Sequence, residues 1–186
     1  MSSIKSLKGT YVLDPSHTSV AFIARHAMVT KVRGTFGTYT GEATIDGANP
    51  AASTLKVVVD VASVNTNSPD RDGHLASPDF FDAATYPHIT FVGTGFDVVD
   101  DSTVEVTGDL TIKDVTRSIT IPFEFAGEAT DPFGNLRVGF EGRTDVSRKD
   151  FGLTWNAVLE TGGVLVSDKI VLEFDVSAIQ NVPAEV

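Results

Sequence analysis

Apolar and polar residues alternate along several short segments of this chain, and this alternation limits its possible folds more than any other feature. It is cleanest over residues 104–113, 119–125 and 170–176, and looser over residues 36–45 and 55–61. Successive side chains of a β-strand point to opposite faces, so a period of two indicates strands with one buried and one solvated face. The pattern predicts a chain built mainly of half-buried β-strands.

Residues that favour turns separate these segments at intervals of about ten residues. Examples are Asp46-Gly47, Gly93 with Gly95, and Gly162-Gly163. Strands joined by short turns pair as antiparallel neighbours, and a long series of them closes into a barrel, which removes exposed edges. We predict one all-β domain over residues 1–186, with its core at about residues 10–178.

One stretch, residues 68–82, departs from the alternation and predicts a short helical insertion. Ser68 and Ser77 are each followed by Pro and Asp, which places a capping hydroxyl, a proline and a carboxylate at the start of two short helical turns. Leu75, Phe80 and Phe81 are the apolar side chains available to dock this insertion against the barrel.

The charge of the chain excludes some classes of partner. The formal net charge is −11 at pH 7 and the 14 Lys and Arg residues are scattered, whereas nucleic-acid binding needs a cationic surface. No apolar stretch approaches the roughly 20 residues that span a bilayer, so we expect no integral membrane insertion. The residues before Tyr11 hold no apolar run typical of a signal peptide, and a cytoplasmic location is therefore expected.

The residues able to carry chemistry form no recognised catalytic or metal-binding pattern. The four His residues, at positions 17, 26, 74 and 88, lack metal-ligand spacing, and there is no Cys. A nucleophile elbow and a phosphate-binding loop are also missing from the sequence. We predict no metal site and no catalytic residue, and interpret Arg71 with Asp72 as an ion pair on a helix surface and residues 148–150 as a solvated turn.

Phenylalanine is abundant, with 12 residues against two Met and one Trp. In an arbitrary β-domain these rings fill a solid core. An eight-stranded barrel, however, is wide enough either for packed side chains or for one slender ligand. The alternation alone does not distinguish a solid core from a lined cavity.

Several motifs of the sequence occur together in one known family. They are DPSHT (14–18), VRGTF (32–36), RDGHL (71–75), DFFD (79–82), YPHITF (86–91), GDLTIKDVT (108–116) and SRKDFGL (147–153). In this order they resemble the YceI-like family of polyisoprenoid-binding proteins, over roughly residues 11–178.

The resemblance implies an eight-stranded antiparallel barrel of lipocalin-like form, with the helical insertion near residues 68–82. It implies an elongated cavity for a long-chain isoprenoid, an isoprenoid quinone or a similar amphipathic lipid, with no other cofactor, and a homodimer is expected. The expected ligand-binding residues are Phe22, His26, Phe36, Leu75, Phe80, Phe81, Phe91, Leu110 and Phe123. Arg71, Asp72 and His74 are expected at the rim, where they either hold the insertion or meet the head group.

Two other functions stay open at this point. The barrel would be an enzyme for an apolar substrate, such as an isomerase or a hydrolase, if His26 or His74 acted as acid or base inside the cavity. It would be a structural or stress-response domain if side chains filled the interior. The volume of the interior and the position of each His discriminate among these functions.

Overall fold

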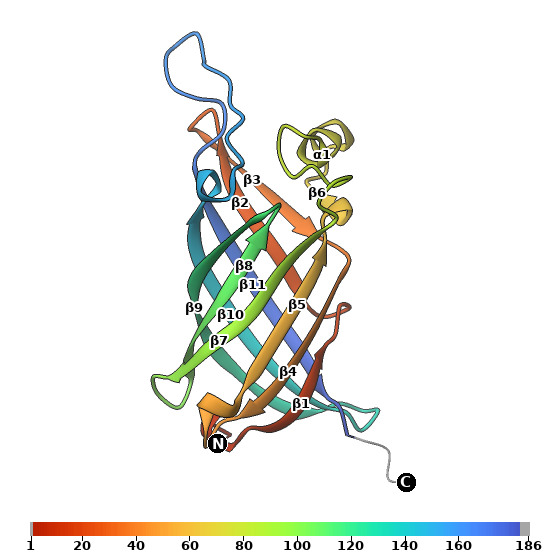
Figure 1. Ribbon diagram of the computed structural model, residues 1–186. Helices are drawn as coiled ribbons and strands as arrows, with labels where there is room; N and C mark the ends of the chain where they lie inside the picture. Colours follow the sequence, from red (N-terminus) through yellow and green to blue (C-terminus); the bar gives the residue numbers. More distant parts are fainter. Residues whose placement is uncertain (1, 183–186) are drawn as a thin grey trace.

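The computed structural model describes residues 2–182, which form a tall β-barrel (Figure 1). Residues 1 and 183–186, which belong to the predicted domain, lie outside the described residues. The strands are β1 (Lys8–Leu13), β2 (Ser19–His26), β3 (Thr30–Phe36), β4 (Tyr39–Asp46), β5 (Thr54–Asp60), β6 (Val64–Asn65), β7 (His88–Val98), β8 (Thr103–Ile112), β9 (Val115–Thr130), β10 (Leu136–Ser147) and β11 (Lys169–Gln180). One α-helix, α1 (Pro69–Ala76), and four short 3₁₀ helices (Ile4–Ser6, Pro50–Ala52, Val61–Ser63 and Arg148–Phe151) complete the described structure.

The eleven strands make eight passes along the barrel, because three of the passes are bent. Their order is β1-β4-β5-β7-β8-β9-β10-β11-β2-β3-β6, and β1 also pairs with β11. β1 and β2 run in one direction along β11, β4 and β3 run back along them, and β5 leads through a 3₁₀ turn into β6. Eight antiparallel passes therefore close one barrel, and the predicted fold class is confirmed.

β11 closes the barrel by pairing with two strands along its length. Its first half pairs with β2, where Leu172 lies opposite Phe22. Its last residues pair with β1, where Ile179 lies opposite Val12. The first and last passes thus meet along one seam, and the main-chain groups of that seam find partners within the sheet.

The bend between β1 and β2 is held by a network of charged side chains. Arg137 of β10 donates a hydrogen bond to Asp14 at 2.6 Å and another to Asp131 at 2.7 Å. The His17 ring lies 2.7 Å from the same Asp14 carboxylate. The hydrogen bond from Arg137, followed by the contact with His17, holds the pKa of Asp14 well below its usual value. The bend is therefore fastened to the turn between β9 and β10.

The predicted alternation is present in the strands themselves. In β8, Val104, Val106 and Leu110 are buried and point into the barrel, whereas Glu105 is exposed. One predicted turn is wrong, because the Gly93 to Gly95 stretch lies inside β7, at a bulge in its pairing with β8. The wall of the barrel is consequently apolar inside and polar outside.

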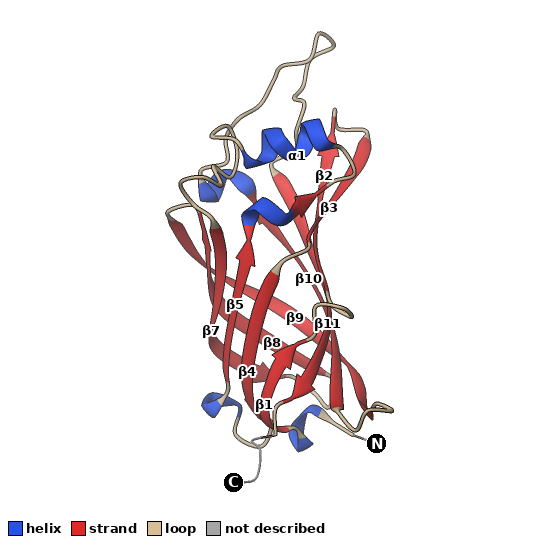
Figure 2. Ribbon diagram, turned by 90° about the vertical axis from the view of Figure 1, so that its right-hand side faces the viewer, coloured by secondary structure: helices blue, strands red, loops and turns tan. Residues whose placement is uncertain are grey.

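The predicted helical insertion lies across the upper end of the barrel (Figure 2). Ser68 caps α1 by accepting a hydrogen bond from the Arg71 main-chain N–H, and Pro69 occupies the first helical position. Of the two predicted helical turns, the first is part of α1, and the second is a hydrogen-bonded turn in which the Phe80 N–H donates to the Ser77 carbonyl at 3.0 Å. Within residues 2–182, no helix is both long enough and apolar enough to cross a bilayer.

The lowered pKa of Asp14 predicts how its contribution to stability depends on pH. Such a contribution is fully present above the unfolded-state pKa, about 3.9, and is lost as the pH falls through the lower folded-state pKa. We expect Asp14→Asn to reduce the free energy of unfolding at pH 7, and the difference from the wild type to shrink below about pH 4. Urea unfolding between pH 3 and pH 7 measures this difference. Asp145→Asn, which removes a solvent-exposed partner of Lys169, is the control and should change little.

Candidate functional site

The barrel encloses a cavity of about 330 Å³ whose wall is almost entirely apolar. Every pass of the barrel contributes inward-facing side chains, as Leu172, Phe174 and Val176 do from β11. Pockets that hold small ligands range from roughly 300 to 1,000 Å³. The interior is therefore hollow, and its size is within the range of ligand-binding sites.

Most of the predicted ligand-binding residues line this cavity. Those that do are Phe22, Phe36, Leu75, Phe80, Phe81, Phe91, Leu110 and Phe123. His26 does not, because it stands at the end of β2 with an exposed side chain and pairs through its main chain with Val166. The geometry thus brings eight of the nine together, and their contact with a ligand stays a prediction.

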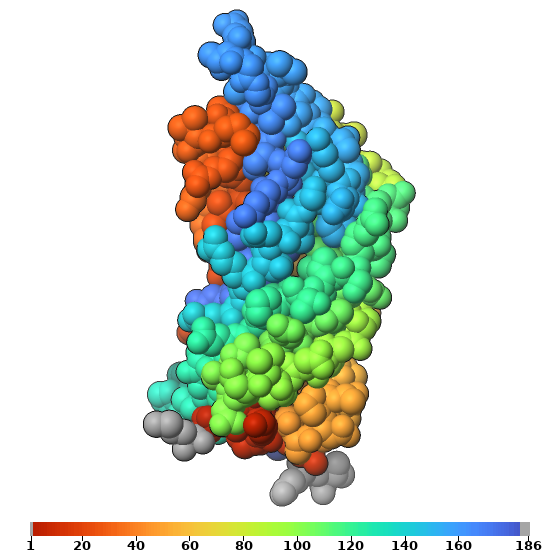
Figure 3. Space-filling view, turned by 90° about the vertical axis from the view of Figure 1, so that its left-hand side faces the viewer, coloured from red at the N-terminus to blue at the C-terminus, as the bar shows by residue number. Residues whose placement is uncertain are grey.

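The N-terminal segment closes the lower end of the cavity. Ile4 and Leu7 are 3% and 2% exposed, and Ile4 packs against Val104 and Val106. The Ile4 N–H donates a hydrogen bond of 3.1 Å to the Asp101 carbonyl. Figure 3 shows this segment, in red, filling the lower end between neighbouring turns. Main-chain hydrogen bonds and apolar packing therefore hold this closure together.

Thr66 organises the polar side of the upper rim. Arg71 donates hydrogen bonds to its hydroxyl at 2.8 Å and to its carbonyl at 2.7 Å. Asp72 accepts from the Thr66 N–H at 2.8 Å and also from its hydroxyl. The predicted ion pair between Arg71 and Asp72 is wrong, because both side chains bind Thr66, the buried residue that precedes the helix.

An aromatic cluster joins α1 to the long segment after β10. The His74 ring meets Phe80 edge-on at 5.0 Å between centroids and Trp155 at 4.7 Å, and Phe80 lies 5.3 Å from Trp155. His74 Nε2 also lies 2.9 Å from the Asp79 carboxylate. The upper end of the cavity is thus covered by two chain segments that meet through side chains.

Arg148 is a buried cation at this end of the cavity, and its predicted place in a solvated turn is wrong. Its side chain lines the cavity and is 5% exposed. The guanidinium donates to the carbonyls of Ser167, Leu153 and Trp155 at 2.9, 2.7 and 2.8 Å. Burial lowers the pKa of Arg148, whereas the nearby Asp168 acts in the opposite direction. One side chain therefore fastens both ends of the loop that carries Trp155.

Tyr11 brings a hydroxyl to the lower part of the cavity wall without bringing charge. Its side chain is 2% exposed and packs with Leu7 and Val138. Burial, together with the charge of Glu128, raises the pKa of Tyr11 above its ordinary value near 10. The phenol is therefore neutral near pH 7.

Trp155 and Arg148 are the rim residues that the sequence did not indicate. Trp155 is the single Trp of the chain and follows a stretch without strand alternation, which is a weak signal for a docked loop. Arg148 stands beside Lys149 and Asp150, so its neighbours have the composition of a solvated turn. Only the packing of the loop around it distinguishes Arg148 from those neighbours.

A closed antiparallel barrel around an apolar cavity defines a lipocalin-like β-barrel protein. The YceI-like domain model matches residues 11–178, and the chain belongs to the YceI-like family. A UPF0312 protein of Pseudomonas syringae pv. tomato is 38% identical over 155 residues, which cover 82% of this chain and 81% of the relative.

Two solved structures share the fold. The Campylobacter jejuni YceI protein is 32% identical and superposes with a TM-score of 0.73 over 85% of this chain and 90% of its own. A polyisoprenoid binding domain from Saccharophagus degradans is 17% identical and has a TM-score of 0.71 over 92% of this chain and 98% of its own. The second likeness is one of fold.

The contacts of Arg148 predict a large effect of its removal. Arg148→Met leaves three carbonyls without their short hydrogen bonds, and we expect a loss of at least about 2 kcal/mol in the free energy of unfolding. Proteolysis within residues 152–168 should also become faster. Lys149→Met is the matched control, because its side chain is 54% exposed and forms only an ion pair with Asp168. Equal unfolding free energies for the two variants would contradict the role assigned to Arg148.

Proposed function

We propose that this protein binds one long-chain amphipathic lipid inside its barrel and stores or carries it without changing it chemically. The class we favour is a long-chain isoprenoid or an isoprenoid quinone. The hollow, almost wholly apolar interior of about 330 Å³ carries this proposal. Burial of each methylene contributes about 0.8 kcal/mol, so some ten buried carbons contribute about 8 kcal/mol before the costs of ordering are subtracted.

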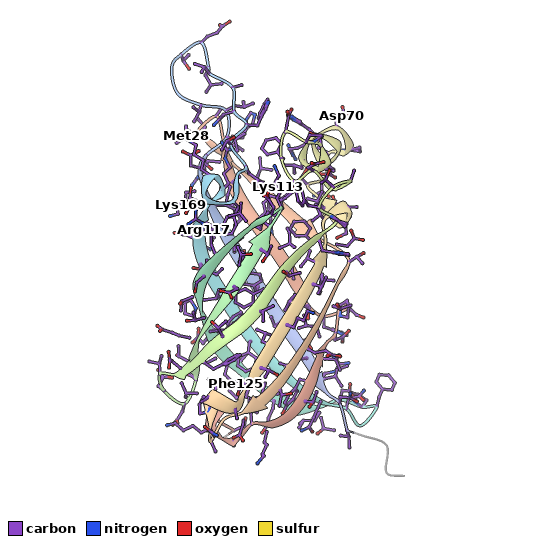
Figure 4. The ribbon with its side chains drawn as sticks, viewed as in Figure 1. Met28, Asp70, Lys113, Arg117, Phe125 and Lys169 are labelled. Atoms are coloured by element: carbon purple, nitrogen blue, oxygen red, sulfur yellow. The ribbon has the colours of Figure 1, made fainter. Side chains whose placement is uncertain are left out.

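The apolar chain of the ligand lies within the barrel, and its head group lies at the upper end. Charged side chains surround that end: Lys113 stands at the turn between β8 and β9, Arg117 and Lys169 stand on the side of the long loop, and Asp70 stands on α1 (Figure 4). A polar head group keeps partners and water there, whereas burial without them is costly. At the lower end the ligand would meet the buried, apolar Ile4.

The ligand enters at the upper end, between the two segments that cover it. Within residues 2–182, no main-chain hydrogen bond joins residues 66–87 to residues 148–168. Their contacts are side-chain packing: Trp155 lies against His74 and Phe80, and Phe80 shares a buried cluster with Phe151 and Leu153. Separation of these side chains opens the cavity without breaking a β-ladder. Arg71 and Asp72, which bind Thr66, hold the helical side of this entrance in place.

Carriage accounts for the cavity better than catalysis does. None of the four His residues, all of them within the described range, belongs to the cavity wall. General acid–base catalysis needs a titratable group within hydrogen-bonding reach of the substrate, and His26 and His74, the residues considered for that role, both lie outside the wall. The fold shared with a domain named for polyisoprenoid binding supports the same class of ligand. The cytoplasmic location and the homodimer stay predictions.

Lipid extraction tests the proposal directly. The protein is purified without detergent, its mass is measured under native conditions, and it is then extracted with organic solvent for mass spectrometry. We expect close to one lipid per chain, with a long apolar chain and a polar head. A protein that carries no lipid and takes up none from a polyprenol suspension would contradict the proposal.

A charge placed in the cavity wall should abolish binding, whereas the same charge one residue away should not. Phe91 lines the cavity, and its neighbour Val92 is 42% exposed on the outer face. We expect Phe91→Lys to reduce lipid affinity at least about tenfold, because an unpaired ammonium is costly in an apolar site. Val92→Lys should bind like the wild type. Native mass spectrometry measures the bound fraction, circular dichroism checks the fold, and Phe91→Gln replaces Phe91→Lys if the latter does not fold.

A further inference from the structure

Three phenylalanine rings of the cavity wall lie against glycines of neighbouring strands. Phe22 on β2 covers Gly34 on β3, Phe123 on β9 covers Gly142 on β10, and Phe91 on β7 covers Gly108 on β8. In each pair the phenylalanine lines the cavity and the glycine lies behind the ring. The three pairs stand on three different parts of the wall.

Space, and not backbone conformation, excludes a side chain at these glycines. A Cβ atom at Gly34 would lie under 3.0 Å from three atoms of the Phe22 ring, and one at Gly142 would lie under 3.0 Å from two atoms of the Phe123 ring. Neither glycine has the positive φ that disfavours L-residues. In the interior of an ordinary strand, alanine is more stable than glycine by roughly 0.5–1 kcal/mol. Glycine at these two positions is therefore explained by the space that the ring occupies.

The requirement follows from strand pairing. Phe22 lies directly opposite Gly34, and Phe123 lies directly opposite Gly142. A ring opposite a glycine folds onto the bare backbone of the next strand, which is a known means of packing a glycine in a sheet. Phe91 lies opposite Leu110 and reaches Gly108 diagonally. A side chain in place of the glycine would push the ring off the wall, and the space open to the ring is the interior of the barrel.

We propose that Gly34, Gly108 and Gly142 are specificity-determining residues, which recess the phenylalanine rings and widen the cavity for a methyl-branched or ring-bearing lipid. A straight acyl chain passes a narrower bore, whereas a branched isoprenoid chain needs the additional width. This inference rests on the proposed function and adds the residues that select among lipids. The three glycines lie behind the rings, so they affect selectivity without touching the ligand.

Alanine substitutions test this with two alcohols of equal carbon number, branched geranylgeraniol and straight-chain eicosanol. We expect Gly34→Ala and Gly142→Ala to lose affinity for geranylgeraniol about tenfold more than for eicosanol, the usual scale for small steric differences in an apolar site. Gly95→Ala is the matched control, because its Cβ would meet its nearest neighbour, Thr107, at 3.8 Å. Gly108 is left unchanged because its Cβ would also meet the Val92 carbonyl at 2.7 Å.

A second substitution in each pair identifies the ring as the cause. Phe22→Leu in the Gly34→Ala protein, and Phe123→Leu in the Gly142→Ala protein, should restore the binding of geranylgeraniol, since the displaced ring is gone. Folded alanine variants that bind both alcohols like the wild type would overturn the inference. So would a loss of affinity that the leucine substitutions do not restore. If a single variant fails to fold and its double variant folds, the ring contact is supported.

Pressure unfolding provides a measure that needs no ligand. The volume decrease on unfolding scales with the internal void, so it should be smaller for Gly34→Ala and Gly142→Ala than for the wild type and for Gly95→Ala. Equal volume changes in all four proteins would contradict the inference. A wild type that binds neither alcohol would instead count against the proposed function, and the pressure result would still decide whether the glycines keep the cavity open.

Discussion

Closure of the sheet by β11 is the constraint on which the other features of this molecule depend. Eight passes around one axis fix the diameter of the barrel, and that diameter admits either packed side chains or one slender ligand. β11 can meet both β1 and β2 only because the chain bends between them, at the network of Asp14, His17 and Arg137. A largely buried network of charged side chains thereby supports the geometry of the interior.

Given that diameter, the residues opposite the large rings decide whether the interior is filled. Twelve phenylalanines in a chain of 186 residues are enough to make a solid core plausible. Rings such as Phe22 and Phe123 lie over the backbone of glycines on the neighbouring strands and line the cavity. Pairing register is therefore, in the inference we propose, one determinant of cavity volume beside side-chain size.

Local pattern was sufficient for the features that depend on neighbours in sequence. Alternation gave the strands, and the Ser68-Pro69 cap gave the start of α1, because both signals act over a few residues. Features that depend on distant partners were missed. Gly93 suggested a turn although it lies in β7 under the ring of Phe96, and Arg148 suggested solvent although carbonyls from a loop up to 19 residues further along surround it. The width of the cavity also depends on distant partners. The alternation identifies the inward positions, but it does not show how far each ring reaches into the interior.

The two ends of the barrel differ in what closes them. Ile4 and Leu7 close the lower end with main-chain hydrogen bonds and nearly complete burial, so opening there would disrupt the sheet's lower turns. The upper end is covered by Trp155 packed on His74 and Phe80, and packed rings part at a smaller cost than a β-ladder. The segments that cover the upper end are joined by side-chain packing, whereas the rings below them belong to paired strands. In the function we propose, a ligand would enter at the rim and would be selected by a wall whose width follows from strand pairing.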